Sequence, residues 1–132
     1  MKPGLRIGDG VTIKVVVTPE MYARFAGEIV HRTYSTVTMI YHMEWASRQI
    51  ILPFLEEDEE GMGSEVKAKH LAPSPAGSQL TITAEVIGLK NNKVITKVSA
   101  RNEKELIGIG EVTQVILSKD RIRELVEDIE QA

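Results

Sequence analysis

Glu44 is the residue whose chemical type fits its position least. It lies in the segment 37–55, where apolar residues occupy most of a helical circumference. Its neighbours one and two turns away are mostly apolar: Val37, Ile40, Tyr41 and Ile51. A carboxylate held in an apolar cleft loses hydration and becomes a useful base or nucleophile. The alternative is an exposed Glu44–Arg48 pair on a solvated stripe, worth roughly 0.3–0.5 kcal/mol.

His70 is the second candidate for chemistry. The period-two pattern of residues 62–72 places Met62, Ser64, Val66, Ala68 and His70 on one face and the charged side chains on the other. The apolar face must meet the central helix, so we expect the imidazole to point toward the helix that carries Glu44. The alternative is a core histidine that is hydrogen-bonded to a carbonyl.

Two further residues could complete a site, Thr36 and Gly63. Thr36 belongs to a cluster of hydroxyls before the long helix, and such residues are also ordinary helix caps. It precedes Glu44 by eight residues, about 12 Å along a continuous helix. The two side chains could therefore meet only through a loop that folds back or across a dimer. Gly63 opens the strand that carries His70, where the backbone could approach a ligand closely, or it serves only a turn.

Composition narrows the possible mechanisms. The chain has 132 residues, which indicates one domain over residues 1–132, and no cysteine, which excludes disulfides and thiolate chemistry. A net charge of -3 without a basic cluster argues against nucleic acid as a partner. No apolar run is long enough to cross a membrane and no secretory signal begins the chain, so we expect a cytoplasmic protein. No motif or residue cluster indicates a metal site or a cofactor.

The order of predicted elements indicates an α+β fold. A strand over 11–17 is followed by a short helix from Pro19 with a stop at Gly27, and then by the long helix. Four strands come next, at 62–72, 79–87, 93–101 and 105–117, and a final helix is capped by Ser118. One antiparallel sheet wrapped around the long central helix satisfies all these faces. Its free edge predicts a homodimer or higher homo-oligomer.

The sequence resembles the hot-dog fold thioesterases, and specifically the fluoroacetyl-CoA thioesterase family. The resemblance is carried by the opening MKPGLRIG, by MEWA, by the strand that ends in His70, by APSPAG and by LTITAEV. It implies a hot-dog fold and a catalytic set of Thr36, Glu44 and His70 near a dimer interface, with Gly63 lining the acyl pocket. Val37 stands where the family has glycine and Val30 where it has an aromatic lid residue, so the acyl group stays open.

The expected activity is hydrolysis of an acyl-CoA thioester to a carboxylic acid and free CoA. Glu44 would activate water or attack directly to form a mixed anhydride. His70 would act on the reacting carbonyl and the leaving sulfur, and Thr36 would orient Glu44 or the carbonyl. Two alternatives stay open: a non-catalytic acyl-CoA-binding or sensing domain, and a hot-dog hydratase, which would need an Asp and His pair early on the helix.

Overall fold

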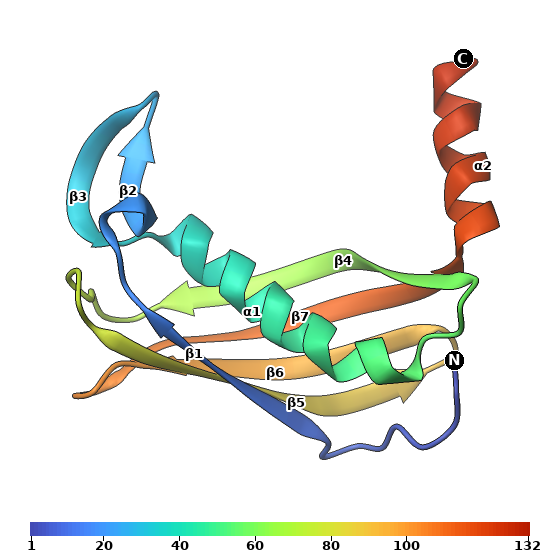
Figure 1. Ribbon diagram of the computed structural model, residues 1–132, viewed down its shortest axis with the longest axis horizontal. Coiled ribbons are helices and arrows are strands. Elements are labelled where there is room, and N and C mark those ends of the chain that lie inside the picture. The colour runs from blue at the N-terminus through green and yellow to red at the C-terminus, as the bar shows by residue number, and fades with distance from the viewer.

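The computed structural model describes residues 1–132 (Figure 1). Seven strands, two α-helices and two short 3-10 turns follow one another along the chain. In order they are β1 Gly10–Val16, the turn Pro19–Met21, β2 Tyr22–Phe25, β3 Glu28–Tyr34, α1 Thr36–Ile51, the turn Leu52–Phe54, β4 Glu59–His70, β5 Gln79–Lys90, β6 Lys93–Arg101, β7 Leu106–Ser118 and α2 Lys119–Glu130.

Five strands form one antiparallel sheet in the order β1-β5-β6-β7-β4, and α1 lies across one face of it (Figure 1). The predicted arrangement, an antiparallel sheet wrapped around a long central helix, is confirmed. Strands β1 and β4 are the two edges of the sheet. No helix is long and apolar enough to cross a membrane.

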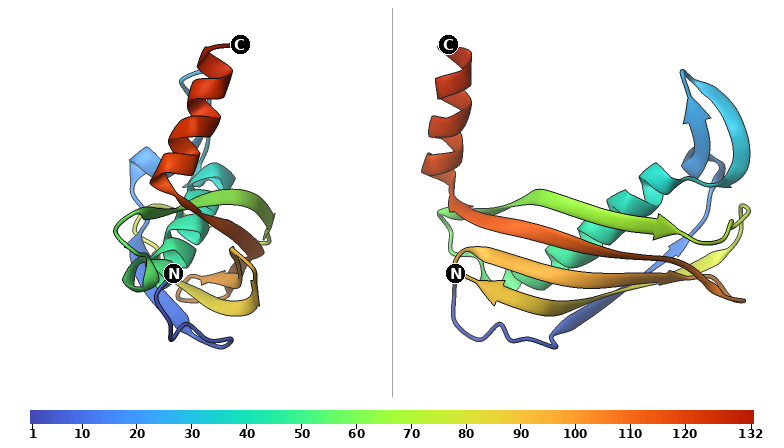
Figure 2. Two further views of the ribbon diagram at one scale, coloured as in Figure 1. Left: turned by 90° about the vertical axis from the view of Figure 1, so that its right-hand side faces the viewer. Right: turned by 180° about the vertical axis from the view of Figure 1, so that it is seen from behind.

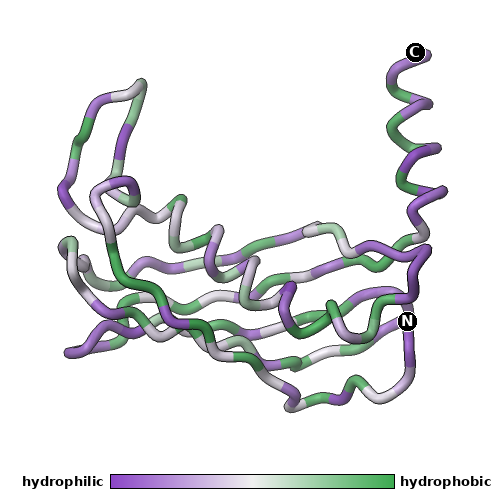
Figure 3. The backbone as a smooth tube through the Cα atoms, viewed as in Figure 1, coloured by the Kyte–Doolittle hydropathy of each residue, from purple (hydrophilic) through white to green (hydrophobic).

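The core forms between α1 and the inner face of the sheet. Its buried residues recur every three or four positions along α1 and at every second position along the strands, because each element buries one face. The buried helical side chains are Met39, Met43, Ala46, Ile50 and Ile51. Those of β5 are Leu80, Ile82, Ala84 and Val86. Figure 3 shows the resulting alternation of apolar and polar residues along the strands.

The predicted short helix after Pro19 is wrong. Only Pro19–Met21 makes a helical turn, and the chain then forms the hairpin β2–β3. Ala26 and Gly27 both have positive φ, 52° and 82°, which is the backbone of a tight two-residue hairpin turn. Gly27 therefore reverses the chain between two strands. The β-branched and aromatic residues on both sides of the turn favour that outcome over a helix.

The predicted inner face of β4 is correct only in its second half. The pairing of β4 with β7 shifts register between Gly63 and Glu65, so that Ser64 forms a bulge. Before the bulge, Gly61 and Gly63 face α1 and Met62 points outward, 43% exposed. After it, the chain returns to the predicted alternation, which ends with His70 toward α1.

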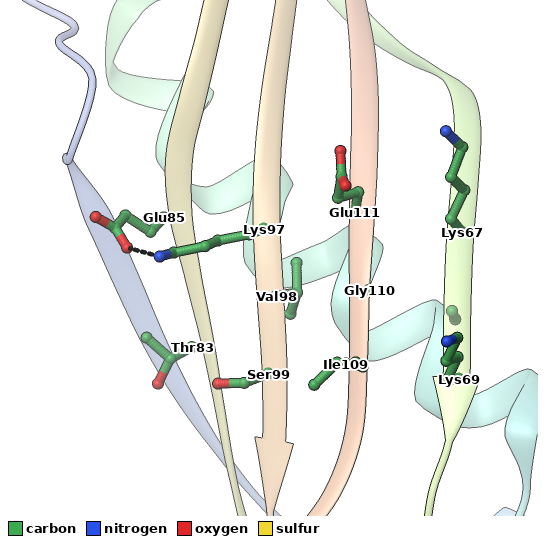
Figure 4. A pocket seen from close by; sticks show the side chains of 11 residues that line it. Lys67, Lys69, Thr83, Glu85, Lys97, Val98, Ser99, Ile109, Gly110 and Glu111 are labelled. Atoms are coloured by element: carbon green, nitrogen blue, oxygen red, sulfur yellow. Dashed lines mark ion pairs between the residues drawn. The ribbon is translucent and has the colours of Figure 1, made fainter.

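The outer face of the sheet carries a band of charged and polar side chains with a few exposed apolar ones, such as Ile87 and Ile109, and is not covered by any element. A hollow of about 510 Å³ lies on it (Figure 4). Neighbouring strands place residues of alternating charge side by side in this hollow: Glu85, Lys97, Glu111 and Lys67. The Glu85 carboxylate lies 3.2 Å from the Lys97 ammonium. Such cross-strand pairs are typical of a solvated sheet face.

Gly110 allows β7 to approach β4 closely. A Cβ added there would lie 2.5 Å from the backbone oxygen of Lys67 and 3.1 Å from the Met43 sulfur. We expect Gly110→Ala to lower the free energy of unfolding by about 1–3 kcal/mol, because backbone must move to admit the methyl group. Urea denaturation measures this change. The exposed control Lys69→Ala is expected to stay within about 0.5 kcal/mol of the unmodified protein, and equal values for both variants would contradict the close approach.

Candidate active site

Thr36 and His70 meet where α1 begins and β4 ends. Ser35 caps the helix by accepting a hydrogen bond from the Thr38 amide, which fixes Thr36 as the first helical residue. The Thr36 hydroxyl lies 2.9 Å from Nδ1 of His70. Because α1 and β4 run in opposite directions, the first residue of the helix lies beside the last residue of the strand. The structure thus brings together two of the predicted site residues.

The His70 ring is held on two sides and has one unused nitrogen. Its Nε2 is buried and has no hydrogen-bond partner. The ring of Tyr34 packs against it edge to face, with centroids 6.2 Å apart and an interplanar angle of 80°. Burial lowers the pKa of His70 below its ordinary value of 6.5, and a backbone contact with Ala72 opposes this shift. The imidazole is therefore predominantly neutral at neutral pH.

A buried Tyr34–His42 pair lies behind His70. The Tyr34 hydroxyl is 2.6 Å from Nδ1 of His42, and the two rings stack with centroids 5.7 Å apart. Burial lowers the pKa of His42 and raises that of Tyr34, so the neutral imidazole accepts a hydrogen bond from the phenol. The sequence does not reveal this pair, because a spacing of eight residues gives no sign that β3 turns Tyr34 toward α1.

Glu44 lies against Gly63, at the other end of β4. A Cβ at position 63 would collide with Oε1 of Glu44, so only glycine leaves room for the carboxylate. Glu44 is half-buried in a hollow of about 420 Å³, which it shares with Tyr41, Trp45 and Arg48.

The alternative Glu44–Arg48 ion pair is not formed. Instead, Nη2 of Arg48 lies 3.1 Å from both carboxylate oxygens of Glu60. Since Arg48 is occupied by Glu60, the Glu44 carboxylate has no hydrogen-bond or ion-pair partner within the protomer and stays open to its hollow.

The four predicted residues thus form two separate pairs. Thr36 and His70 line a hollow of about 670 Å³, whose other walls come from the hairpin and from residues 71–73. Glu44 lies about 12 Å further along α1, against Gly63 of β4, and borders a different hollow. Within one protomer the carboxylate does not reach the Thr36–His70 pair. No group of three or more His, Asp and Glu side chains is placed to hold a metal ion.

Comparisons with known proteins agree on one class. The sequence profile of the fluoroacetyl-CoA-specific thioesterase family matches residues 17–120. The chain is 28% identical over 127 residues to the fluoroacetyl-CoA thioesterase of Streptantibioticus cattleyicolor, covering 92% of this chain and 91% of the relative.

Solved structures extend the agreement to three dimensions. A thioesterase superfamily member from Thermus thermophilus has a TM-score of 0.94 and 43% identity, covering 99% of this chain and 96% of that one. A mutant of the fluoroacetyl-CoA-specific thioesterase has a TM-score of 0.88 and 26% identity, covering 96% and 98%. The α+β fold is therefore the hot-dog fold of the thioesterase superfamily. The chain belongs to the fluoroacetyl-CoA-specific thioesterase family and is a thioester hydrolase.

The two buried histidines predict how stability depends on pH. Because burial lowers the pKa of His42 and of His70, the unfolded chain binds more protons than the folded chain in mildly acidic solution. We expect the free energy of unfolding to be highest above about pH 6.5. It should decrease as the pH falls from there through the lowered pKa values of the two histidines. Urea denaturation between about pH 7.5 and pH 5 measures this slope.

The matched control is the double variant His42→Gln/His70→Gln, which is expected to have a flatter slope over the same range. Carboxylates such as Glu59 and Glu60, whose pKa is lowered from 4.5, stay charged throughout this pH range. Their contribution to the free energy of unfolding is lost only at lower pH. An equal slope in the unmodified protein and the double variant would contradict the assignment.

Proposed function

We propose that this protein hydrolyses an acyl-CoA thioester to a carboxylic acid and free CoA, in sites that two copies of the chain share. The observation that carries the proposal is the separation of the Glu44–Gly63 pair from the Thr36–His70 pair along one helix. A structure of the fluoroacetyl-CoA-specific thioesterase with fluoroacetate and CoA, 27% identical to this chain, supports CoA as the carrier.

A single two-fold axis would complete both sites. Strand β4 has an unpaired edge, and two such edges could pair antiparallel and continue the sheet. The midpoint between Thr36 and Glu44 is Ile40, and the midpoint between Gly63 and His70 lies between residues 66 and 67. An axis through these midpoints sets Thr36 beside the partner's Glu44 and His70 beside the partner's Gly63.

The exposed face of α1 supports the same axis. Three large side chains on this face are exposed although they are apolar or aromatic: Val37 by 74%, Tyr41 by 59% and Trp45 by 45%. They lie four residues apart and form one stripe along the helix, on the side of Glu44. A second α1 packed antiparallel across this stripe would remove it from water. It would also desolvate the Glu44 carboxylate, as its role requires.

The roles of the polar residues follow from their contacts. In this mechanism Nδ1 of a neutral His70 accepts a hydrogen bond from the Thr36 hydroxyl, and Nε2, the nitrogen without a partner, carries the ring proton. This N–H can donate to the thioester carbonyl oxygen or to the leaving sulfur. The positive end of the α1 dipole lies beside the same carbonyl position and adds stabilisation.

The partner's Glu44 supplies the attack on the thioester carbonyl. As a base it takes a proton from water while the water oxygen bonds to the carbonyl carbon. As a nucleophile it bonds to that carbon itself, and water then hydrolyses the anhydride. In both routes the carbon–sulfur bond breaks and the CoA thiolate leaves and takes up a proton. Arg32, in the wall of the Thr36–His70 hollow, is a candidate contact for CoA phosphates.

Removal of the carboxylate tests the activity. We expect Glu44→Gln to lower kcat by orders of magnitude while the melting temperature is kept, because the amide cannot act as base or nucleophile. His70→Ala is expected to cost at least ~10²-fold. Release of free thiol from short-chain, aromatic and long-chain acyl-CoAs measures turnover. The exposed control Glu57→Gln, which lies outside the strands, should keep full activity, and an active Glu44→Gln variant would remove the proposed role.

Mixed dimers test whether the sites are shared. One chain carries Glu44→Gln and the other carries His70→Ala, with different affinity tags so that heterodimers can be purified. One of the two shared sites then contains an intact His70 and an intact Glu44, so about half of the normal activity should return. If each protomer held its own complete site, the heterodimer would stay as inactive as its two parents.

A further inference from the structure

Two elements of the fold extend beyond the β4 edge without being covered. The hairpin β2–β3 rises from one end of the sheet and α2 rises from the other, and both point to the same side (Figures 1 and 2). This is the side on which a second copy would pair through β4. Neither element contributes to the core of its own protomer except through Tyr34, at the base of the hairpin.

Helix α2 has an apolar stripe that nothing in its own protomer covers. The stripe consists of Ile122, Leu125, Val126 and Ile129, at the spacing of one helical face. Leu125 is 38% exposed, Val126 47% and Ile129 76%, so exposure increases toward the tip. A helix of 12 residues without tertiary packing is marginal in water. The stripe therefore requires a partner surface.

The β2–β3 hairpin also has apolar side chains that its own protomer leaves exposed. It is a two-stranded ribbon, and such a ribbon is at best marginally stable by itself. Phe25 is 68% exposed, Val30 52% and Ile29 42%. The hairpin, which rises on the β4 side of the molecule, thus also presents apolar side chains to water.

The charges of α2 are arranged against its own dipole. Lys119 and Arg121 flank the apolar stripe in the first turn, and Asp128 and Glu130 flank it in the last turn. The remaining charges lie toward the polar face, where Arg123 pairs with Asp120 of the first turn and with Glu127. Anions at a C-terminus and cations at an N-terminus are unfavourable for an isolated helix. The hairpin has the complementary order, with Glu28 at its tip and His31 and Arg32 toward its base. Antiparallel packing of the two elements would bring opposite charges together at both ends.

We propose that α2 of one protomer packs antiparallel along the β2–β3 hairpin of the other, so that each apolar surface covers the other. The inference rests on the shared-site dimer proposed above. A two-fold axis normal to the sheet exchanges the two ends of the molecule, and so brings α2 beside the partner's hairpin. Within one protomer the two elements stand at opposite ends and cannot meet (Figure 2).

The contact would act on the active site. Val30 and Arg32 of the hairpin line the same hollow as Thr36 and His70. A helix from the other chain therefore holds the wall of this hollow in place. Each site then contains the Thr36–His70 pair and hairpin of one protomer, with the carboxylate and the C-terminal helix of the other.

Engineered cysteines test the contact directly, because the natural chain contains no cysteine. We place Val30→Cys with Ile129→Cys in one variant, and Phe25→Cys with Leu125→Cys in another. Under mild oxidation both variants are expected to form covalent dimers, seen on a non-reducing gel and lost on reduction. The matched control Val30→Cys with Glu127→Cys puts the second thiol on the polar face of α2 and should not cross-link.

Sedimentation of the same variants separates the two possible failures. A dimer that forms no disulfide in either variant would overturn the α2–hairpin contact and leave the shared-site dimer standing. A monomer would overturn both. Cross-linking of the polar-face control as efficiently as the stripe variants would also overturn the contact, since it would show random collision.

A second measurement avoids cysteines. Leu125→Asp/Ile129→Asp should increase the rate of tryptic cleavage after Arg24 and Arg32, because the hairpin loses its cover. The polar-face variant Glu124→Gln/Glu127→Gln should leave that rate unchanged. Unaltered cleavage in the aspartate variant would contradict the proposed packing.

Discussion

The close, antiparallel packing of α1 on β4 is the constraint on which the rest of the structure depends. Glycine at position 63 admits the Glu44 carboxylate at one end, and the hydrogen bond between Thr36 and His70 closes the other. Because both contacts join the same two elements, the four residues lie along one line rather than in one cluster. The residues of the proposed active site are therefore divided between two places on each protomer, and assembly becomes part of the proposed mechanism.

Much of this arrangement could be predicted from the sequence, because periodicity reports which side of an element is buried. The period of two in β5 and β6, and the apolar sector of α1, were enough to predict the sheet around the helix. His70 at the helix was predictable for the same reason. The hairpin was not, because a threonine followed by a proline and an acidic residue is also the pattern that begins an α-helix, and the bulge at Ser64 leaves no signal in residue type.

Features that depend on contacts between distant residues could not be predicted from the sequence. The Tyr34–His42 pair joins the end of β3 to the second turn of α1, and only the folded chain brings these groups together. The Tyr34 ring of this pair packs against His70, so a hydrogen-bonded polar pair lies next to His70 among otherwise apolar residues. Likewise, Arg48 seemed available to Glu44 by its helical spacing, yet Glu60 from β4 holds it. Tertiary contacts override local spacing in both cases.

The alternating charges on the outer face of the sheet have a consequence for behaviour at high concentration. A broad antiparallel sheet with one uncovered face is a surface on which other sheets could stack. Rows of lysine and glutamate bind water that stacking would have to remove, which costs free energy. These rows of charge thus oppose the stacking of one such sheet on another.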